Sequence, residues 1–258
     1  ATLMAKRVLA CVQGSMADWQ AADQSELAEL MPTNRRYAFD VRKIIRHLFD
    51  TESFIETRPD MGRAIITGLA RVEGRAVAVL ASDCRHLGGA IDGESATKAA
   101  ALYQLAERWR LPVVSLIDTP GFMVGPESEA GGAPRLMSDL FIAGATLTQP
   151  IIAIFLRRAY GLGAMAMTGG SFGVPRYAVS WPQGEFGAMG LEGAVHLGFR
   201  QELAEAPDEG ARQALYDKLL AEMYDKGRAV EAASYLEIDA VIQPEETRAA
   251  ISRALIAS

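Results

Sequence analysis

The sequence predicts an α/β protein with a largely parallel sheet. Short apolar runs of strand type, such as residues 113–117 and 151–156, alternate with longer segments whose apolar residues recur at helical spacing. Such alternation is typical of parallel strands that are joined by helices. Half of the 258 residues are hydrophobic, so the chain is long enough and apolar enough to bury a full core.

Strands are predicted by short runs rich in β-branched and other apolar residues. In chain order they are expected at 64–66, 76–80, 113–117, 151–156, 177–181 and 238–242. The first two runs are joined through Glu73-Gly74, which predicts a hairpin. The runs at 113–117 and 151–156 are continuously apolar, as expected for strands that are buried on both faces.

Helices are predicted by apolar residues three and four positions apart. In chain order they are expected at 40–49, 95–110, 134–147, 163–167, 192–199 and 207–226. Gly227 is expected to be the C′ glycine of the last of these, and Pro244 opens one more helix. The first thirty residues also have amphipathic helical spacing, with a break near Gly14. The turn cluster Met31-Pro32-Thr33-Asn34 marks the best candidate domain boundary.

The composition excludes several classes of protein. The formal net charge of −6 argues against nucleic acid as the main partner. No apolar run reaches the ~18 residues of a membrane span. Two cysteines, Cys11 and Cys84, make no disulfide framework and fit a reducing compartment, so we expect a cytoplasmic protein. The three histidines lack the spacing of metal ligands, so we expect no metal site.

Three glycine-rich loops follow predicted strands, where ligands collect in parallel sheets. The first, at 86–92, contains Gly88 and Gly89, whose backbone N–H groups could hold an oxyanion or a phosphate. The competing interpretation is a tight turn that needs positive φ. His86 beside this loop is the one histidine of functional interest.

The second loop, at 118–122, combines an acidic residue with a Pro-Gly pair that suits a type II turn. Asp118 could cap backbone N–H groups. Phe122 could face a cleft or the core. The next strand is followed by Arg157-Arg158, which could meet an anionic ligand, although a basic pair at the end of a strand is more often solvated.

The third loop runs from residue 157 to 166. Gly161, Gly163 and Ala166 match the dinucleotide-binding pattern G-x-G-x-x-[GA], but the next strand ends without the acidic residue that this pattern requires. We therefore prefer backbone N–H donors of Gly163 and Ala164 at a helix start. Such donors stabilise a developing oxyanion by on the order of 3 kcal/mol each.

Residues 169–173 spell G-x-S-x-G, as in the nucleophile elbow of hydrolases. That motif needs a strand before Ser171 and a helix after it, whereas a helix-like segment precedes it here and Val174-Pro175 follows. Glu185 and His196 stand in the order of a triad, but nothing in the sequence places them together. The sequence therefore disfavours a hydrolase.

Taken together, these segments resemble one family. The chain is similar to the carboxyltransferase of biotin-dependent acyl-CoA carboxylases, of the propionyl-CoA and acetyl-CoA carboxylase β-subunit type. The matching stretches are RAIITGLARVEG at 63–74, 87–92 with Lys98-Ala99-Ala100, DTPGFMVG at 118–125, RRAYGLGA at 157–164, Ser180-Trp181-Pro182 and MGLEGAV at 189–195. They occur in the family's order and cover nearly the whole chain.

The resemblance implies a fold, a reaction and partners. The fold would be crotonase-like (ClpP/crotonase), with ββα units coiled into a superhelix. The reaction would transfer the carboxyl group of carboxybiotin to the α-carbon of an acyl-CoA. A whole carboxyltransferase has two such halves, and this chain matches the C-terminal half, which receives biotin. The partners would be the acyl-CoA-binding N-terminal half, biotin carboxylase, the biotin carrier and further copies of the chain.

The same resemblance assigns residues to this site. Gly163 and Ala164 match the pair whose amides form an oxyanion hole for the ureido oxygen of biotin. The positions that shape the rest of the cleft match Gly88, Gly89, Ala90, Phe122 and Tyr160. Met165 and Ala166 stand where propionyl-type enzymes have a tyrosine and an aspartate, so the acyl-CoA is left open.

The resemblance also divides the chain. We expect residues 1–31 to be a linker or the tail of a preceding domain, and residues 32–258 to be the C-terminal crotonase-like domain. Because the chain does not begin with Met, we expect a fragment or a separately made domain that is incomplete without the N-terminal half.

Three alternatives stay open at this point. A biotin-dependent decarboxylase α-subunit would use the same site in reverse. A stand-alone crotonase-like hydratase or isomerase would need a general acid or base, for which Asp92, Asp118 and Glu185 are candidates. A non-catalytic half would mainly assemble the oligomer.

Overall fold

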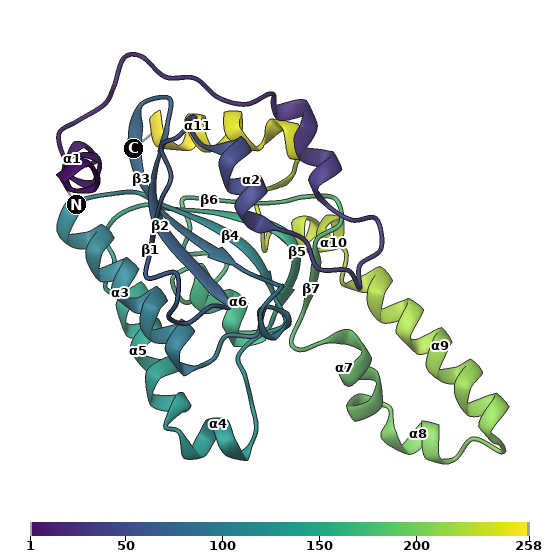
Figure 1. The fold of residues 1–258 in the computed structure, drawn as a ribbon. Coiled ribbons are helices and arrows are strands. Elements are labelled where there is room, and N and C mark those ends of the chain that lie inside the picture. The colour runs from purple at the N-terminus through teal and green to yellow at the C-terminus, as the bar shows by residue number, and fades with distance from the viewer. Residues whose placement is uncertain (1, 257–258) are drawn as a thin grey trace.

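This computed structural model describes residues 2–256, in which a mixed sheet lies between two layers of helices (Figure 1). The strands are β1 Ile55–Thr57, β2 Ile65–Val72, β3 Arg75–Ser82, β4 Val113–Thr119, β5 Ile151–Tyr160, β6 Tyr177–Ser180, β7 Glu185–Gly187 and β8 Ala240–Val241. They pair in the order β1-β2-β3-β4-β5-β6-β8, with β7 beside β5. Pairing is antiparallel from β1 to β3 and parallel from β3 to β8. The predicted α/β class is confirmed.

The helices match most of the predicted ones. They are α1 Thr2–Ala10, α2 Val41–Leu48, α3 Gly93–Trp109, α4 Pro126–Ala130, α5 Ala133–Ala145, α6 Gly161–Met167, α7 Leu191–Gly198, α8 Arg200–Ala204, α9 Glu209–Lys226, α10 Ala229–Ser234 and α11 Thr247–Ile256. Three short 3-10 helices are η1 Gln24–Leu30, η2 Leu87–Gly89 and η3 Pro244–Glu246. None of the described helices is both long and apolar enough to cross a membrane.

Alternating side chains on the central strands build two cores. Successive residues of a strand point to opposite faces, so Val113 and Ile117 of β4 join one apolar cluster, while Val114 and Leu116 join the other. The first cluster includes residues of α3 and α5, and the second includes residues of α2 and α11. All of β4 is buried, which explains its continuous apolar run.

The predicted hairpin is confirmed, and its turn is as tight as a hairpin turn can be. Val72 pairs with Arg75, so only Glu73 and Gly74 lie between the strands. Both have positive φ, 50° and 76°, as the two central residues of a type I′ turn require. The right-handed twist of the two strands favours this turn.

Several expectations are corrected. β5 continues to Tyr160, so Arg157-Arg158 lie within the strand and not in a loop. The expected helix of the first thirty residues is limited to α1 and η1, with no helix at 15–23. Gly227 has φ of −86°, so it is not a left-handed C′ glycine. A Cβ there would lie 2.8 Å from the carbonyl oxygen of Phe186, and close packing explains the glycine.

The elements that the sequence did not predict are all short. They are β1, β7, α4, α8 and α10, too short to show a periodic pattern. The boundary expected at residue 31 stays a prediction. Leu27 and Met31 of the preceding segment are buried in the core that α2 closes.

Helices α7, α8 and α9 form an arm that extends away from the sheet (Figure 1). α9 has 18 residues, none of them buried. The arm returns to the sheet at Gly227, whose carbonyl oxygen accepts a hydrogen bond of 2.7 Å from the N–H group of Phe186 in β7.

Candidate active site

The end of β4 carries a buried carboxylate, Asp118. Its side chain is fully buried and is bound by two arginines. Nη2 of Arg157 lies 2.7 Å from Oδ2, and Nε of Arg158 lies 2.8 Å from Oδ1. We call these three residues the Asp118 cluster. The backbone N–H group of Arg158 also donates to Oδ1 of Asp118, at 3.1 Å, so Asp118 does accept from a backbone group as predicted. The prediction that the two arginines are solvated is corrected.

A β-bulge lets two consecutive arginines reach one carboxylate. Consecutive side chains of a regular strand point to opposite faces. Ile117 pairs with Phe155 and Thr119 pairs with Ala159, so Asp118 alone faces three residues of β5. The bulge turns both arginines toward β4, which is how such irregularities re-aim side chains beside functional sites.

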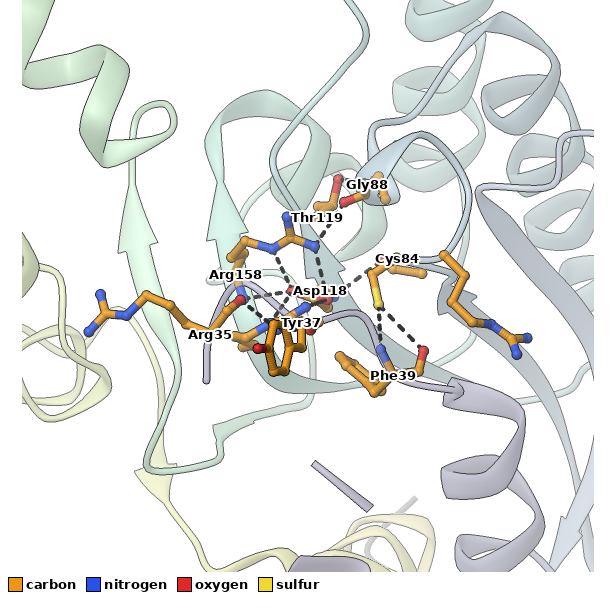
Figure 2. Close-up of polar contacts among 12 residues, drawn as sticks. Arg35, Tyr37, Phe39, Cys84, Gly88, Asp118, Thr119 and Arg158 are labelled. Atoms are coloured by element: carbon orange, nitrogen blue, oxygen red, sulfur yellow. Dashed lines mark hydrogen bonds and ion pairs between the residues drawn. The ribbon is translucent and has the colours of Figure 1, made fainter. Parts of the chain in front are cut away.

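The two arginines bind two chain segments to the sheet. Nη1 of Arg157 donates to the carbonyl oxygens of Arg35 and Tyr37, both at 2.8 Å. Figure 2 shows Arg158 between Asp118 and Gly88, whose carbonyl oxygen accepts at 2.8 Å. The Asp118 cluster therefore positions residues 35–37 and the first glycine loop.

The first glycine loop turns its carbonyl groups toward the cluster. The hydroxyl of Thr119 donates to the carbonyl oxygen of Gly89 at 2.7 Å. The N–H groups of Gly89 and Ala90 are engaged within the turn, by the carbonyl oxygens of His86 and Leu87. Their amides therefore shape this loop, and the tight-turn interpretation describes it.

The first and second loops are joined by a short parallel bridge. The N–H group of Ile91 donates to the carbonyl oxygen of Gly121 at 3.0 Å, and that of Met123 donates back to Ile91 at 2.9 Å. Gly121 has φ of 113°, in the region that favours glycine, but residues 120–121 form neither a hydrogen-bonded turn nor a bend, so the predicted type II turn is not found. Phe122 is half-buried and contacts the ring of Phe141 at 6.1 Å between centroids.

Helix α6 starts directly against this second loop. A Cβ on Gly163 would lie 2.7 Å from the carbonyl carbon of Gly121 and 2.9 Å from the nitrogen of Phe122. Only glycine allows such a close approach of two backbones. The structure therefore brings Gly163 against Phe122, and the resemblance assigns both residues to the same proposed site.

The start of α6 leaves backbone donors free. Tyr160 is its N-cap, and the carbonyl of an N-cap residue accepts the first bond of the helix, from the N–H group four residues later. That donor belongs to Ala164. The N–H groups of Leu162 and Gly163 precede it and have no acceptor in the helical ladder.

Beside Tyr160 lies a pocket of about 270 Å³, which Gly88, Arg158 and Tyr160 help to line. The hydroxyl of Tyr160 donates to Oε2 of Glu185 at 2.8 Å. Burial is the main reason that the pKa of this tyrosine is raised, and Glu185 raises it further. The hydroxyl therefore stays protonated and remains a donor.

Glu185 links this pocket to the arm. Nη1 of Arg35 lies 3.2 Å from Oε1 of Glu185. The guanidinium carbon of Arg35 lies 3.8 Å from the centroid of the Tyr224 ring on α9. The hydroxyl of Tyr224 donates to Glu192 of α7 at 2.6 Å. Together with Tyr160, these four residues form what we call the Glu185 cluster.

The other predicted residues lie elsewhere. Ala166 is fully buried in the core, where its carbonyl oxygen accepts from the hydroxyl of Tyr103. Met165 is half-buried within α6. Ser171 is exposed in a turn after α6, with neither the strand nor the helix of a nucleophile elbow. His196 stacks on Tyr216 in the arm. Among the described residues there is no group of three or more that could hold a metal ion.

Sequence reasoning missed Arg35, Tyr224 and the pairing within the Asp118 cluster. One signal was present for the cluster. An aspartate ends one parallel strand and two arginines lie near the end of its neighbour, and such ends meet at the same edge of a sheet. Arg35 and Tyr224 come from segments far apart in the sequence, with no local pattern that connects them.

Comparisons with known proteins cover nearly the whole chain. A family model described as the carboxyl transferase domain matches residues 10–258. The beta6 subunit of a biotin-dependent acetyl-/propionyl-coenzyme A carboxylase from Mycobacterium bovis is 34% identical over 250 residues, which are 96% of this chain and 52% of that protein. The propionyl-CoA carboxylase beta chain of Saccharopolyspora erythraea is 32% identical over 94% of this chain and 45% of that protein. This chain thus spans about half the length of the curated relatives it matches.

Solved structures agree with this likeness. One, a single-chain, multi-domain long-chain acyl-CoA carboxylase, superposes with a TM-score of 0.90 at 47% identity, over 98% of this chain and 25% of that chain. Another, the transcarboxylase 12S hexamer with methylmalonyl-coenzyme A bound, has a TM-score of 0.90 at 28% identity, over 99% of this chain and 50% of that chain. The predicted crotonase-like fold is confirmed.

Proposed function

The chain belongs to the carboxyl transferase domain family, and from that premise we propose that it is the biotin-receiving half of an acyl-CoA carboxyltransferase. The carboxyl group would pass to the α-carbon of an acyl-CoA. Carboxybiotin, when bound, supplies that group, and negative charge gathers on its ureido oxygen as the group leaves. The residues of this chain have to bind that oxygen and exclude water around it.

The start of α6 is the observation that carries this proposal. Leu162 and Gly163 have N–H groups outside the helical ladder, at the positive end of the helix dipole. Gly163 is held against the loop of Gly121 and Phe122, so the donors are fixed before any ligand arrives. Fixed donors of this kind stabilise developing negative charge.

The geometry refines the expected donor pair. The sequence-based pair is Gly163 and Ala164, but the N–H group of Ala164 begins the ladder by bonding to Tyr160. We therefore place the oxyanion donors on Leu162 and Gly163. Tyr160, Gly88 and Phe122 keep their proposed positions around the cleft.

The candidate acids and bases support a transferase over a stand-alone hydratase or isomerase. Asp92 caps α3 by accepting from the N–H group of Ser95. Asp118 is held between two arginines, and Glu185 is bound by Tyr160 and Arg35. Each carboxylate is already engaged, so none is free to take the proton that the α-carbon loses. The biotin anion that remains after the carboxyl group leaves would accept that proton, so this route requires no side-chain acid or base.

A proline at position 162 tests the donor role. Proline removes the N–H group and is tolerated in the first turn of a helix, and the side chain of Leu162 is 62% exposed. In the complete carboxylase, Leu162→Pro is expected to lower kcat by about 10²-fold. Leu162→Ala, which keeps the N–H group, is the control and should stay near the wild-type rate. A folded Leu162→Pro enzyme with full kcat would refute the donor role.

Gly163 is the poorer position for this test. Any Cβ there meets the backbone of Gly121 within 3 Å, so Gly163→Pro would shift the loop as well as remove a donor. A loss of activity in that variant would not separate the two causes.

We also propose that the chain works with a second half that binds the acyl-CoA, with biotin carboxylase and biotin carrier components, and in a homo-oligomer. The relatives are about twice as long, and one solved relative is described as a hexamer. The purified chain is expected to carboxylate no acyl-CoA until the second half is added. Full turnover by the chain alone, with carboxybiotin and an acyl-CoA, would contradict this division.

A further inference from the structure

A cavity of about 290 Å³ lies between α3 and the edge formed by β1 and β2. It shares no lining residue with the pocket beside Tyr160. Its apolar wall comes from α3 and includes Leu102 and Leu105. Its ionisable lining residues are all cations, namely Arg58, Lys98 and Arg108.

Lys98 is the unusual member of this set. The residue is 1% exposed, and its Nζ donates to the carbonyl oxygen of Ile65 at 2.8 Å. An ammonium group has three donors. Among the described residues no carboxylate oxygen is found within 4 Å of this nitrogen. A buried charge is costly unless it is paired and hydrogen-bonded.

Two carboxylates, Glu56 and Asp60, act on Lys98 without direct contact. Both raise the pKa of Lys98, but burial outweighs them and lowers that pKa. Both oxygens of Glu56 accept from Arg42, at 2.6 and 2.9 Å. Among the described residues, Lys98 therefore forms no direct ion pair, and Glu56 is shared with Arg42.

The cavity wall follows one face of α3. Residues 98, 102, 105 and 108 recur at steps of three and four, the spacing of a single helical face. Along that face, Lys98 and Arg108 stand on either side of Leu102 and Leu105. Thr57 and Thr67, whose hydroxyls are 2.8 Å apart, line the strand side.

We propose that this cavity binds a small organic anion whose carboxylate or phosphate group pairs with Lys98 and whose short apolar part packs on Leu102 and Leu105. Small-molecule sites have volumes of roughly 300–1,000 Å³, so this cavity suits a ligand of a few carbons and excludes a nucleotide. This proposal goes beyond carboxyl transfer and does not depend on it.

Titrations of the chain with sodium hexanoate, inorganic phosphate and hexylammonium chloride test this proposal by NMR. We expect saturable shifts at the amides of Thr57, Thr67 and α3 with one or both anions, and none with hexylammonium. The anion that binds identifies the head group. Absence of saturable shifts with both anions, or equal shifts with hexylammonium, would refute the proposal.

Lys98→Met keeps the length of the side chain and removes its charge. It is expected to weaken anion binding by about tenfold or more, because a charge-assisted hydrogen bond is lost. Lys218→Met is the matched control, since Lys218 is exposed on α9 and does not line the cavity. Equal affinity of the Lys98→Met variant and the wild type would overturn the site.

A second variant keeps the test decisive if Lys98→Met fails to fold. Ala101→Phe leaves all charges in place and fills the cavity from its α3 wall, so it is expected to abolish binding. Unchanged binding by a folded Ala101→Phe chain would refute the proposal. Leu162→Pro is expected to bind the anion normally, which separates this site from the proposed transferase site.

Discussion

Two charged clusters meet at the pocket beside Tyr160, and they differ in burial. In the Asp118 cluster, the side chains of Asp118 and Arg157 are 0% and 4% exposed. In the Glu185 cluster, Arg35 is 49% exposed and Glu185 is 14% exposed. A buried charge that loses its partner has no water to replace it, whereas an exposed pair exchanges its partner for solvent at little cost. The first cluster should therefore behave as an anchor and the second as an adjustable rim.

The difference also shows in what each cluster holds. The Asp118 cluster binds the backbone of residues 35–37 and of Gly88, so it positions loops through groups that cannot move independently. The Glu185 cluster is made of side-chain contacts to α7 and α9, elements of an arm with little buried surface. Mutations in the Asp118 cluster should therefore lower the stability of the protein, whereas mutations in the Glu185 cluster should mainly change the position of the arm.

The largest effect is expected from Asp118→Asn. This change keeps the size of the side chain but leaves the buried guanidinium group of Arg157 and the partly exposed one of Arg158 without their counter-charge. We expect the free energy of unfolding to fall by about 3–5 kcal/mol, as measured by urea denaturation. Glu192→Gln, on the exposed side, is the control. A loss no larger than that of the control would break the contrast between anchor and rim.

The same carboxylate should contribute to the pH dependence of stability. Burial tends to raise the pKa of Asp118, but the hydrogen bonds and charges of Arg158 and Arg157 hold it below its ordinary value. A folded-state pKa below the unfolded one stabilises the protein above about pH 4, and this stability is lost as pH falls through the folded pKa. Urea denaturation at decreasing pH should show a shallower acid loss in Asp118→Asn. Equal slopes would assign the acid loss to other groups.

Tyr160→Phe should have an intermediate effect. It removes the hydrogen bond to Glu185 and leaves that carboxylate paired with Arg35. We expect the free energy of unfolding to fall by about 1 kcal/mol. Tyr235→Phe provides the matched control, because Tyr235 is 78% exposed. A loss as large as that of Asp118→Asn would place Tyr160 with the anchor.

The smallest effect is expected from Arg35→Lys, which keeps the charge near Glu185 but loses the flat guanidinium over Tyr224. Its coupling with Tyr224 should be about 0.5–1 kcal/mol, measured by a double-mutant cycle with Tyr224→Leu. A coupling near zero would show that the ring contact contributes nothing to the position of the arm.

Much of the fold could be read from local patterns. The apolar runs of β4 and β5 and the helical spacing of α3 gave their places to within a few residues, because such periodicity reflects which faces are buried. The glycine loops were expected at strand ends, and Gly163 and Phe122 do meet there. Short elements such as β7 and α8 lack enough residues for a period.

The candidate site was only partly accessible from the sequence. For the loop of Gly88 and Gly89, the sequence left two interpretations open, amide donors for an anion or a tight turn, and the structure shows that the turn engages the amide of Gly89. The role of Arg35 depends on Glu185 and Tyr224, which are remote in the chain. Contacts of this kind produce no periodic pattern in the sequence, because arginine, glutamate and tyrosine also occur on solvated surfaces where they make no such contact.

By itself, the sequence determined the α/β class, the hairpin at Glu73-Gly74 and the likeness to carboxyltransferases, because these depend on local propensity and on short contiguous motifs. Only the tertiary structure decided that Arg157 and Arg158 share Asp118 and that the free donors of α6 begin before Ala164. The physical reason is that strand register and helix start decide which backbone and charged groups find partners. Register and helix starts are settled when distant segments pack together.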